Sequence, residues 1–228
     1  MSKSIVLKNI GKKYFSHTNI KVLNDISFTF EKGKIYSLVG PSGSGKSTFL
    51  NLLSLIDQPN SGSIEILSKK IDFSEKVQND KIRSEKIGII YQDKNLLNDF
   101  TALENIYLPK LLLTNDKKNS IEEAKKISKK VNLTSRLNHY PSELSGGEIQ
   151  RVAISRALIN EPEIILADEP TGNLDSKSGH EIMKIFDELH RSGNTIILVT
   201  HEDDIAKYSN RIVRLLDGKI VSDETVKK

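Results

Sequence analysis

The chain has 228 residues and a formal net charge of +4, from 34 lysine and arginine residues against 30 aspartate and glutamate residues. This length is typical of one large globular domain that folds without metal or disulfide staples, and so small a charge favours solubility over a nucleic-acid surface. Cysteine is absent, which excludes disulfides, thiolate metal sites and cysteine nucleophiles, so the cytosol is the expected compartment.

The chain has neither the pattern of a secretory leader nor that of a membrane span. Residues 1–5 pass at once into alternating polar and apolar residues, so no leader is predicted. A transmembrane helix needs about 20 consecutive apolar residues. The longest apolar runs, such as 196–199 and 111–113, are far shorter, so we expect no crossing of a bilayer.

Apolar runs of strand length alternate with helical patterns, and the strands gather toward the two ends of the sequence. This alternation is typical of an α/β fold. In the run 26–30 apolar and polar residues alternate, which predicts a half-buried antiparallel strand. The runs 35–39, 164–167 and 195–200 are almost continuously apolar, which predicts strands buried on both faces of a parallel sheet.

A phosphate-binding motif follows the strand predicted at 35–39. It fills the pattern G-x-x-x-x-G-K-[ST] with Gly40, Pro41, Ser42, Gly43, Ser44, Gly45, Lys46 and Ser47, and a helical run starts at Thr48. Glycines let backbone N–H groups approach phosphate oxygens, and the helix adds free amides and the positive end of its dipole. We therefore expect Lys46 to reach the β- and γ-phosphates of a nucleotide and Ser47 to bind Mg²⁺.

The strand signal disappears between about residues 97 and 160, where helix-start signals take over. Thr101 with Glu104, and Ser120 with Glu123, each fit a capping box at a helix N-terminus. We therefore predict a helical insertion in the α/β domain. With no repeat, low-complexity segment or linker in the chain, one compact unit is the simplest partition.

Lysines are concentrated within this stretch, at positions 117, 118, 125, 126, 129 and 130. A nucleic-acid contact would explain such a cluster. Glu122, however, lies four residues before Lys126, which suits an ion pair on a solvated helix face. We favour the solvated face and expect no nucleic-acid partner.

A second small-residue turn, consisting of Ser145, Gly146, Gly147 and Glu148, precedes a helical run at 149–158. A turn of this kind at a helix N-terminus is again suited to an anion. The chain therefore carries two candidate phosphate sites that are roughly a hundred residues apart in the sequence. We call residues 145–148 the signature turn.

Two carboxylates, Asp168 and Glu169, follow the apolar run 164–167 directly. In a site with a phosphate loop, the first is suited to hold Mg²⁺, directly or through water. The second is suited to orient or deprotonate a water molecule aimed at the γ-phosphate. The sequence thus predicts both halves of a nucleotide-hydrolysing site.

These elements, in this order, make nearly the whole chain resemble the nucleotide-binding subunit of an ATP-binding cassette (ABC) transporter. The resemblance implies a P-loop NTPase fold of the ABC type, with an α/β core, an antiparallel β subdomain and a helical subdomain. It implies one nucleotide-binding domain over residues 1–228, with the helical subdomain at about 97–160. It also implies an ATPase whose cofactors are ATP and Mg²⁺ and whose hydrolysis is coupled to transport.

The resemblance assigns roles to further residues. Tyr14 matches the aromatic residue that stacks on adenine, and Gln92 matches the glutamine that contacts Mg²⁺ and the attacking water. His201 matches the histidine that contacts the γ-phosphate, and Asn173-Leu174-Asp175 resembles the loop that touches the opposite subunit. The catalytic residues would be Glu169, His201 and Lys46, and the metal ligands Ser47, Gln92 and Asp168.

In this family the signature turn of one subunit closes on the nucleotide held by the phosphate loop of the other. The resemblance therefore implies that a second copy of this chain is a partner, in a head-to-tail dimer with ATP in each interface. Ser145 and Gly147 would supply donors to the partner's ATP. Because the donors come from two chains, we expect hydrolysis to depend on closure of the dimer.

Integral membrane permease subunits are the other implied partners, and the chain would lie peripherally on the cytoplasmic face of the inner membrane. Leu96, Leu97 and Phe100 stand in a polar context after Gln92. They are either ordinary core residues or an apolar docking groove for a short helix of a membrane subunit.

The segments 100–106 and 168–175 are similar to the branch of the family that contains LolD, MacB and FtsE, and 99–105 looks closest to LolD. This similarity implies extraction of lipoproteins from the inner membrane with LolC/LolE-like permeases. The alternatives are the ATPase of a MacB-type efflux pump or of an FtsE-type cell-division complex.

Two positions near the signature turn depart from the family's commonest pattern. Glu148 replaces a glutamine, as is usual in this branch, and Ile149 stands where a polar residue is more typical. The second departure affects the helix surface and not the turn. A soluble ABC ATPase acting on DNA or ribosomes is disfavoured, because the chain has neither tandem cassettes nor a long coiled-coil insertion.

Overall fold

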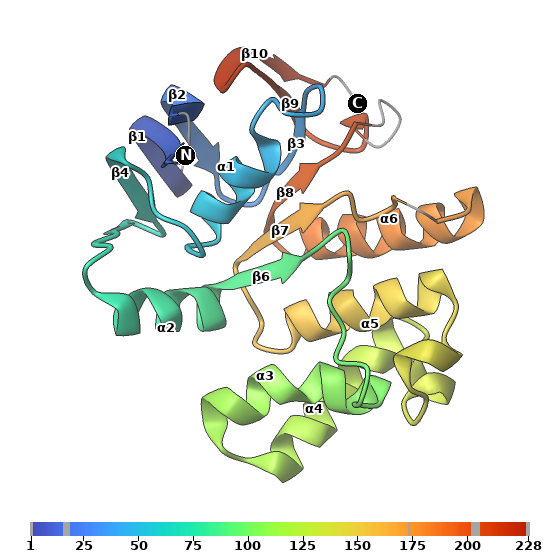
Figure 1. Cartoon of the computed structure of the whole chain (residues 1–228). Coiled ribbons are helices and arrows are strands. Elements are labelled where there is room, and N and C mark those ends of the chain that lie inside the picture. The colour runs from blue at the N-terminus through green and yellow to red at the C-terminus, as the bar shows by residue number, and fades with distance from the viewer. Residues whose placement is uncertain (1, 16–18, 173, 202–205, 227–228) are drawn as a thin grey trace.

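The structure, a computed structural model, describes residues 2–15, 19–172, 174–201 and 206–226 (Figure 1). Its strands are β1 (Lys3–Phe15), β2 (Asn19–Glu31), β3 (Ile35–Val39), β4 (Ser61–Ile66), β5 (Lys69–Lys70), β6 (Ile87–Ile90), β7 (Ile164–Asp168), β8 (Thr195–Val199), β9 (Arg211–Leu216) and β10 (Lys219–Thr225). Its α-helices are α1 (Lys46–Leu53), α2 (Lys76–Lys86), α3 (Ala102–Thr114), α4 (Lys117–Lys130), α5 (Gly146–Leu158) and α6 (Ser176–Arg191). Two 3₁₀ turns are η1 (Thr134–Arg136) and η2 (Pro141–Glu143).

The larger sheet has the strand order β10-β9-β3-β8-β7-β6, and its strands from β9 to β6 run parallel. β10 pairs antiparallel with β9 at one edge. The three runs that we predicted to be buried on both faces are β3, β7 and β8, in the interior of this sheet. Every residue of β3 and β8 is buried, so the prediction of a parallel α/β sheet is confirmed.

The smaller sheet is antiparallel, with the order β2-β1-β4-β5, and the alternating run 26–30 lies in β2 as predicted. α1 lies between the two sheets (Figure 1). Phe49 on α1 packs near Phe30 of β2, which contacts Tyr36 of β3 edge to face. These aromatic residues belong to one buried cluster that joins both sheets to α1. The first helix, and the loop before it, are therefore firmly anchored.

The helices between β6 and β7 form a layer with an apolar cluster of their own. Ile106 of α3, Ala124 of α4 and Val152 of α5 are all fully buried in it. Figure 1 shows these helices gathered on one side of the larger sheet, and no strand occurs between residues 91 and 163, all of which the structure describes. The helical insertion is present as expected, while its boundaries at 97 and 160 stay a prediction.

The capping box predicted at Thr101 is confirmed, because its hydroxyl accepts from the Glu104 backbone N–H and the Glu104 carboxylate accepts in return. The box predicted at Ser120 is wrong. α4 starts at Lys117, and its cap is Asp116, which accepts from the Asn119 backbone N–H at 3.0 Å. Ser120 is buried one turn inside the helix and donates to the Asp116 backbone oxygen at 2.6 Å.

The ion pair predicted on α4 also differs. Lys126 pairs with Glu123, three residues before it, at 2.7 Å, instead of with Glu122. Both spacings place side chains on one helix face, so the general interpretation of an exposed, ion-paired surface is unaffected. None of the helices in the described part of the chain is long and apolar enough to span a membrane.

Candidate functional site

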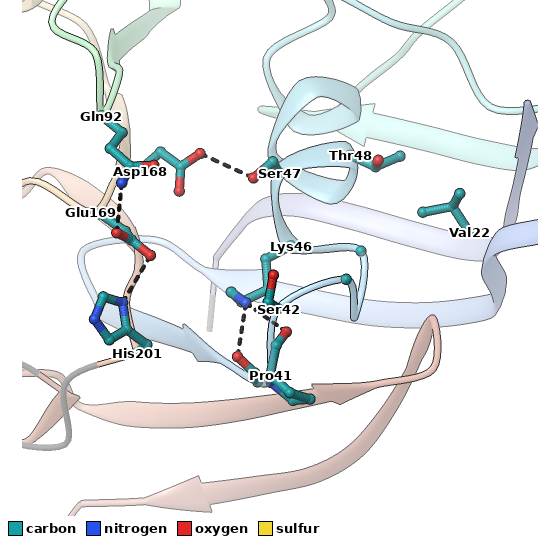
Figure 2. Close-up of a pocket in the computed structure, with 13 residues that line it drawn as sticks. Val22, Pro41, Ser42, Lys46, Ser47, Thr48, Gln92, Asp168, Glu169 and His201 are labelled. Carbon is teal, nitrogen blue, oxygen red and sulfur yellow. Dashed lines mark hydrogen bonds and ion pairs between the residues drawn. The ribbon is translucent and has the colours of Figure 1, made fainter. Parts of the chain in front are cut away.

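The loops that follow β3, β6, β7 and β8 leave the same edge of the larger sheet, because these strands are parallel. They enclose a cavity of about 580 Å³ (Figure 2). It is lined by Val22, Gly40, Pro41, Ser42, Gly43, Gly45, Lys46, Ser47, Thr48, Gln92, Asp168, Glu169 and His201. Most of the residues predicted from separate motifs therefore share one cavity.

Residues 40–47, the phosphate loop, have a backbone that only glycine permits at two points. Gly45 has a φ of 102°, and a Cβ there would lie 2.9 Å from the Leu23 side chain. A Cβ on Gly40 would collide with the backbone oxygen of Leu215. α1 then begins without a side-chain cap, so the backbone N–H groups of its first turn are free to bind an anion.

Lys46 and Ser47 lie at the start of α1. The Lys46 Nζ donates to the backbone oxygens of Gly40 and Pro41 at 2.8 and 2.9 Å. The Ser47 Oγ donates to Asp168 Oδ2 at 3.2 Å, as Figure 2 shows. The hydroxyl of the loop therefore lies beside the first carboxylate at the end of β7, while the ammonium contacts the loop's own backbone oxygens.

Both carboxylate oxygens of Glu169, and its backbone N–H, have hydrogen-bonding partners. Gln92 Nε2 donates to Oε2 at 2.9 Å, and His201 Nδ1 lies 2.9 Å from Oε1. The Glu169 backbone N–H donates to the Val199 oxygen at 2.8 Å. Its φ of 45° lies in the left-handed region, which residues other than glycine seldom adopt and which is found mainly at functional sites.

The electrostatics of the cavity favour a cation beside Asp168. Burial raises the pKa of Asp168 above its usual value, and the neighbouring charge of Glu169 raises it further. The hydrogen bond from Ser47 and the charge of Lys46 act in the opposite direction without cancelling this effect. A carboxylate with a raised pKa gains stability in its ionised form when positive charge is added nearby.

Some predicted residues lie elsewhere. Tyr14, on β1, is 40% exposed and does not line the cavity; its hydroxyl donates to Asp57 Oδ2 at 2.8 Å. Ser44 is buried beneath the loop. Asp175 caps α6 by accepting from the backbone N–H groups of residues 177 and 178 at 3.0 Å. Asn173 lies outside the described residues, and the signature turn does not line this cavity.

Val22 lines the cavity, and sequence reasoning missed it. It lies on β2, opposite an irregularity in the pairing with β1 between Lys12 and Lys13. A single apolar residue in an alternating strand carries no motif. The sequence therefore offered no signal that would have placed Val22 at the cavity.

The signature turn is bound into the start of α5. Ser145 Oγ accepts from the Glu148 backbone N–H, and the Glu148 carboxylate accepts from the backbone N–H and the hydroxyl of Ser145 at 2.8 and 2.9 Å. Arg136 donates to the same carboxylate at 2.7 Å. The backbone hydrogen bond from Ser145, followed by the bond from Arg136, lowers the pKa of Glu148 to about 2.

We expect Glu148→Gln to lower the free energy of unfolding by about 1 kcal/mol at neutral pH, because the turn loses a charge-assisted cap. The pKa of Glu148 is lowered from 4.5 to about 2, so its contribution is complete above about pH 4.5 and is lost as the pH falls toward 2. In urea unfolding, the difference between parent and variant should be full at neutral pH, shrink as the pH falls below about 4.5 and vanish near pH 2.

The control is Glu188→Gln, which removes an exposed carboxylate from α6 and should leave both unfolding curves nearly unchanged. A difference between parent and Glu148→Gln that persists undiminished in acid would contradict the assigned role of the ionised carboxylate.

The fold and the site together define a P-loop nucleoside triphosphatase, with a phosphate loop at a helix N-terminus and a carboxylate pair at a strand end. The ABC transporter family profile matches residues 23–172. The chain belongs to the ABC transporter family, and it is an ATPase subunit or domain of such a transporter.

Three relatives illustrate this. The lipoprotein-releasing system ATP-binding protein LolD of Rickettsia felis is 44% identical over 94% of this chain and 96% of its own length. The macrolide export ATP-binding/permease protein MacB of Bartonella quintana is 41% identical over 98% of this chain, which spans only 34% of MacB. The dimeric structure of the cassette MJ0796 in a post-hydrolysis state with ADP and Pi has a TM-score of 0.92 at 38% identity, covering 98% of this chain and 99% of that one. The resemblance to the LolD and MacB branch is confirmed.

Proposed function

We propose that the cavity holds the phosphates of ATP in the loop 40–47 and that Glu169 acts as the base for the attacking water. The observation that carries this proposal is convergence: Lys46, Asp168 and Glu169 come from separate elements and line one cavity. In phosphoryl transfer a protein mainly positions the nucleophile and stabilises charge on the phosphate oxygens. Lys46 supplies that charge, and Glu169 positions the water.

The oxygen ligands at and beside Ser47 suit Mg²⁺. This ion is usually bound by one or two carboxylates together with water and substrate phosphates, and the Asp168 carboxylate lies against the Ser47 hydroxyl. The Gln92 amide donates its N–H to Glu169, which leaves its oxygen for the metal. The raised pKa of Asp168 supports a cation there. Bound Mg²⁺ would neutralise charge on the β- and γ-phosphates.

His201 and Gln92 orient the base. Each contacts a different oxygen of Glu169, so together they fix the carboxylate plane. Because a carboxylate oxygen only accepts, Nδ1 of His201 donates to Glu169, and the far ring nitrogen, Nε2, donates to a γ-phosphate oxygen when the ring carries both protons. The imidazole side chain is 63% exposed, which keeps that edge accessible to a nucleotide.

We infer that two copies of this chain complete each ATP site. The signature turn begins α5 with a capped helix N-terminus, yet it lies outside the chain's own cavity. Such a turn suits phosphate oxygens presented by another molecule. The related cassette MJ0796 is itself described as dimeric with ADP and Pi. In this arrangement Ser145 and Gly147 bind the partner's ATP, and Asp175 lies near the same interface.

We infer that membrane permease subunits dock at a groove of about 540 Å³ between α3 and the start of β6. Its apolar wall includes Ile56 and Leu112, which are 49% and 78% exposed. Leu97 and Phe100 are also exposed, but neither lines this groove, and Leu96 packs against the helical cluster. Exposed apolar side chains in a groove suit one face of a short helix.

We propose that the chain drives a lipoprotein-releasing complex from the cytoplasmic face of the inner membrane, with LolC/LolE-like permeases. The match to LolD over nearly the full length of both chains supports this. A MacB-type efflux pump is the second candidate, supported by the 41% identity to the MacB of B. quintana. The domain assignment, residues 1–228 with a helical subdomain at about 97–160, belongs to the same proposal.

Affinity purification of this chain with its native membrane partners tests the assignment. Two different permeases holding two copies of this chain would support lipoprotein release. One self-pairing membrane protein with a large periplasmic domain would support the pump and contradict lipoprotein release.

The same preparation tests the groove. We expect Leu112→Asp to reduce the recovered membrane subunit by about tenfold or more, because a charge replaces an apolar contact. Val77→Asp is the matched control, since Val77 is an 86% exposed apolar residue on α2 outside the groove, and it should not change recovery. Equal loss in both variants would contradict docking at α3.

The loop that carries Gln92 is tied to the helix that carries the signature turn. Arg156 of α5 donates to the backbone oxygens of Asn95 and Lys94 at 2.7 and 2.8 Å. Both of these loop residues have positive φ values, 43° and 57°. The guanidinium thus holds a strained backbone with two parallel bonds, which a lysine ammonium cannot reproduce.

We expect Arg156→Lys to lower the turnover rate by about tenfold while the affinity for ATP changes little, because a misplaced Gln92 affects the positioned water and not the phosphate loop. Steady-state kinetics and equilibrium binding separate these quantities. Arg214→Lys, which replaces an exposed arginine on β9, is the control. Equal losses in affinity and turnover would contradict the link through Gln92.

A further inference from the structure

We propose that Asp57 and Lys12 are positioning residues for recognition of the adenine base: they hold the Tyr14 ring in the orientation in which it stacks. The proposal rests on the proposed function, in which the loop 40–47 holds the phosphates of ATP, and it takes Tyr14 as the residue that the resemblance matches to adenine stacking. It adds two residues that lie outside every nucleotide motif in the chain.

The Asp57 carboxylate joins the two other residues. Its Oδ2 accepts from the Tyr14 hydroxyl at 2.8 Å, and its Oδ1 accepts from the Lys12 Nζ at 2.5 Å. The backbone N–H of Gln58 donates to Oδ1 at 2.7 Å, and the Gln58 backbone oxygen accepts from Lys12 at 2.8 Å. Two donors therefore hold Oδ1 of the carboxylate, and its other oxygen, Oδ2, accepts from the tyrosine.

Lys12 also contacts the ring itself. Its ammonium lies 4.8 Å from the centroid of Tyr14, within the range of a cation–π interaction. The Lys12 side chain is only 8% exposed, and its ammonium pairs with Asp57. The charge next to the ring is therefore buried and fixed in place. Tyr14 remains 40% exposed, which leaves ring surface for a base to cover. Burying a lysine charge costs free energy unless the charge is paired, so Lys12 depends on its ion pair with Asp57.

Tyr14 does not line the cavity itself, but it contacts Thr48, which lines the cavity together with Val22. Tyr14 pairs with Ile20 across the β1–β2 hairpin, and Val22 follows two residues later in β2, at the irregular pairing opposite Lys12 and Lys13. The Thr48 side chain hydrogen-bonds to the Tyr14 hydroxyl. Figure 2 shows Val22 and Thr48 on the side of α1 away from Glu169 and His201. A base attached to phosphates in the loop would meet Tyr14 there.

Electrostatics keep this arrangement intact at neutral pH. Partial burial, together with the hydrogen bond to Asp57, raises the pKa of Tyr14, so the phenol keeps the proton that it donates. Although burial opposes it, hydrogen bonding from Lys12 and then Tyr14 lowers the pKa of Asp57. The donor and the acceptor therefore stay in the states that the contact requires. A ring held in advance loses less conformational freedom when a base binds.

The test compares ATP with inorganic triphosphate, which lacks the base, by calorimetric binding without divalent cations so that no turnover occurs. We expect Tyr14→Phe and Asp57→Asn each to weaken ATP binding by about three- to tenfold and to leave triphosphate binding unchanged. Tyr14→Phe keeps the Lys12–Asp57 pair, so it remains informative if Asp57→Asn folds poorly. Asp80→Asn, which alters an exposed ion pair with Arg83 on α2, should change neither affinity.

A double-mutant cycle tests whether Asp57 acts on ATP affinity through the Tyr14 ring. In a Tyr14→Ala chain, Asp57→Asn should cause no further loss of ATP affinity, because its effect passes through the ring. A full additional loss in that chain, or equal weakening of ATP and triphosphate, would overturn the positioning role and leave the stacking role of Tyr14 standing. Unchanged ATP affinity in Tyr14→Ala would overturn both.

Discussion

Glu169→Gln is expected to bind ATP about as well as the parent chain and to hydrolyse it about 100- to 10,000-fold more slowly, the range that a general base contributes. The substitution keeps the side-chain volume and one hydrogen-bonding oxygen for Gln92 or His201. It removes the carboxylate that we propose accepts the proton of the attacking water. Steady-state phosphate release, with ATP affinity measured separately, gives the two values.

Glu169→Gln should also change the assembly state of the chain. If ATP joins two copies and only hydrolysis separates them, Glu169→Gln with ATP should accumulate a dimer that light scattering detects. Glu163→Gln, which lies just before β7 and pairs with Lys32 and Lys86 away from the cavity, is the matched control. Near-normal turnover in Glu169→Gln would remove Glu169 from the role of base.

The second large effect is complementation between two inactive chains. Lys46→Ala disables the phosphate loop, and Gly146→Asp places a negative charge in the signature turn. A Cβ on Gly146 meets Leu174 at an ordinary 3.5 Å, whereas one on Gly147 would lie 3.1 Å from Ser178, so the first glycine tolerates a side chain better. Aspartate in the first turn of α5 also suits the helix dipole, so the fold is preserved while phosphate is repelled.

Each variant alone should be inactive, because every site in its dimers lacks one half. Random pairing of equal amounts makes half of the dimers mixed, and each mixed dimer has one complete site, so about a quarter of the parent activity should return. A chain with both substitutions, mixed with either single variant, forms no complete site and should restore nothing. An inactive mixture despite proven exchange of subunits would contradict a site shared between two chains.

The sequence predicted those parts of the fold and the site that local rules determine. The phosphate loop was recognisable because its glycines and lysine are required within eight consecutive positions, and Asp168 with Glu169 because a buried strand ends there. The capping box at Thr101 depends on three consecutive peptide units and could be predicted for the same reason. At Ser120 the same rule was wrong, because α4 already begins one turn earlier, where Asp116 caps it.

Contacts between segments that lie far apart in the chain could not be predicted from local sequence patterns. Asp57 meets Tyr14, and Arg156 meets Lys94, across separations that no short pattern spans. Val22 enters the cavity through an irregular strand pairing. The internal capping bonds of the signature turn were not predicted either, whereas its place outside the chain's own cavity agrees with the resemblance, which assigns the turn to a partner's nucleotide.

The strand order of the larger sheet gives the residues of the site unequal freedom. β7 and β8 are hydrogen-bonded on both sides, so Asp168, Glu169 and His201 leave a continuous ladder that resists relative movement. β6 is an edge strand with one neighbour, and the loop beyond it is attached to the helical layer through Arg156. In the proposed function, a rotation of that layer would therefore act on the site first through Gln92 and its hydrogen bond to Glu169, while β7 and β8 hold the two carboxylates and His201 in place. A partner bound to the helical layer would then have a route by which to change the rate of hydrolysis.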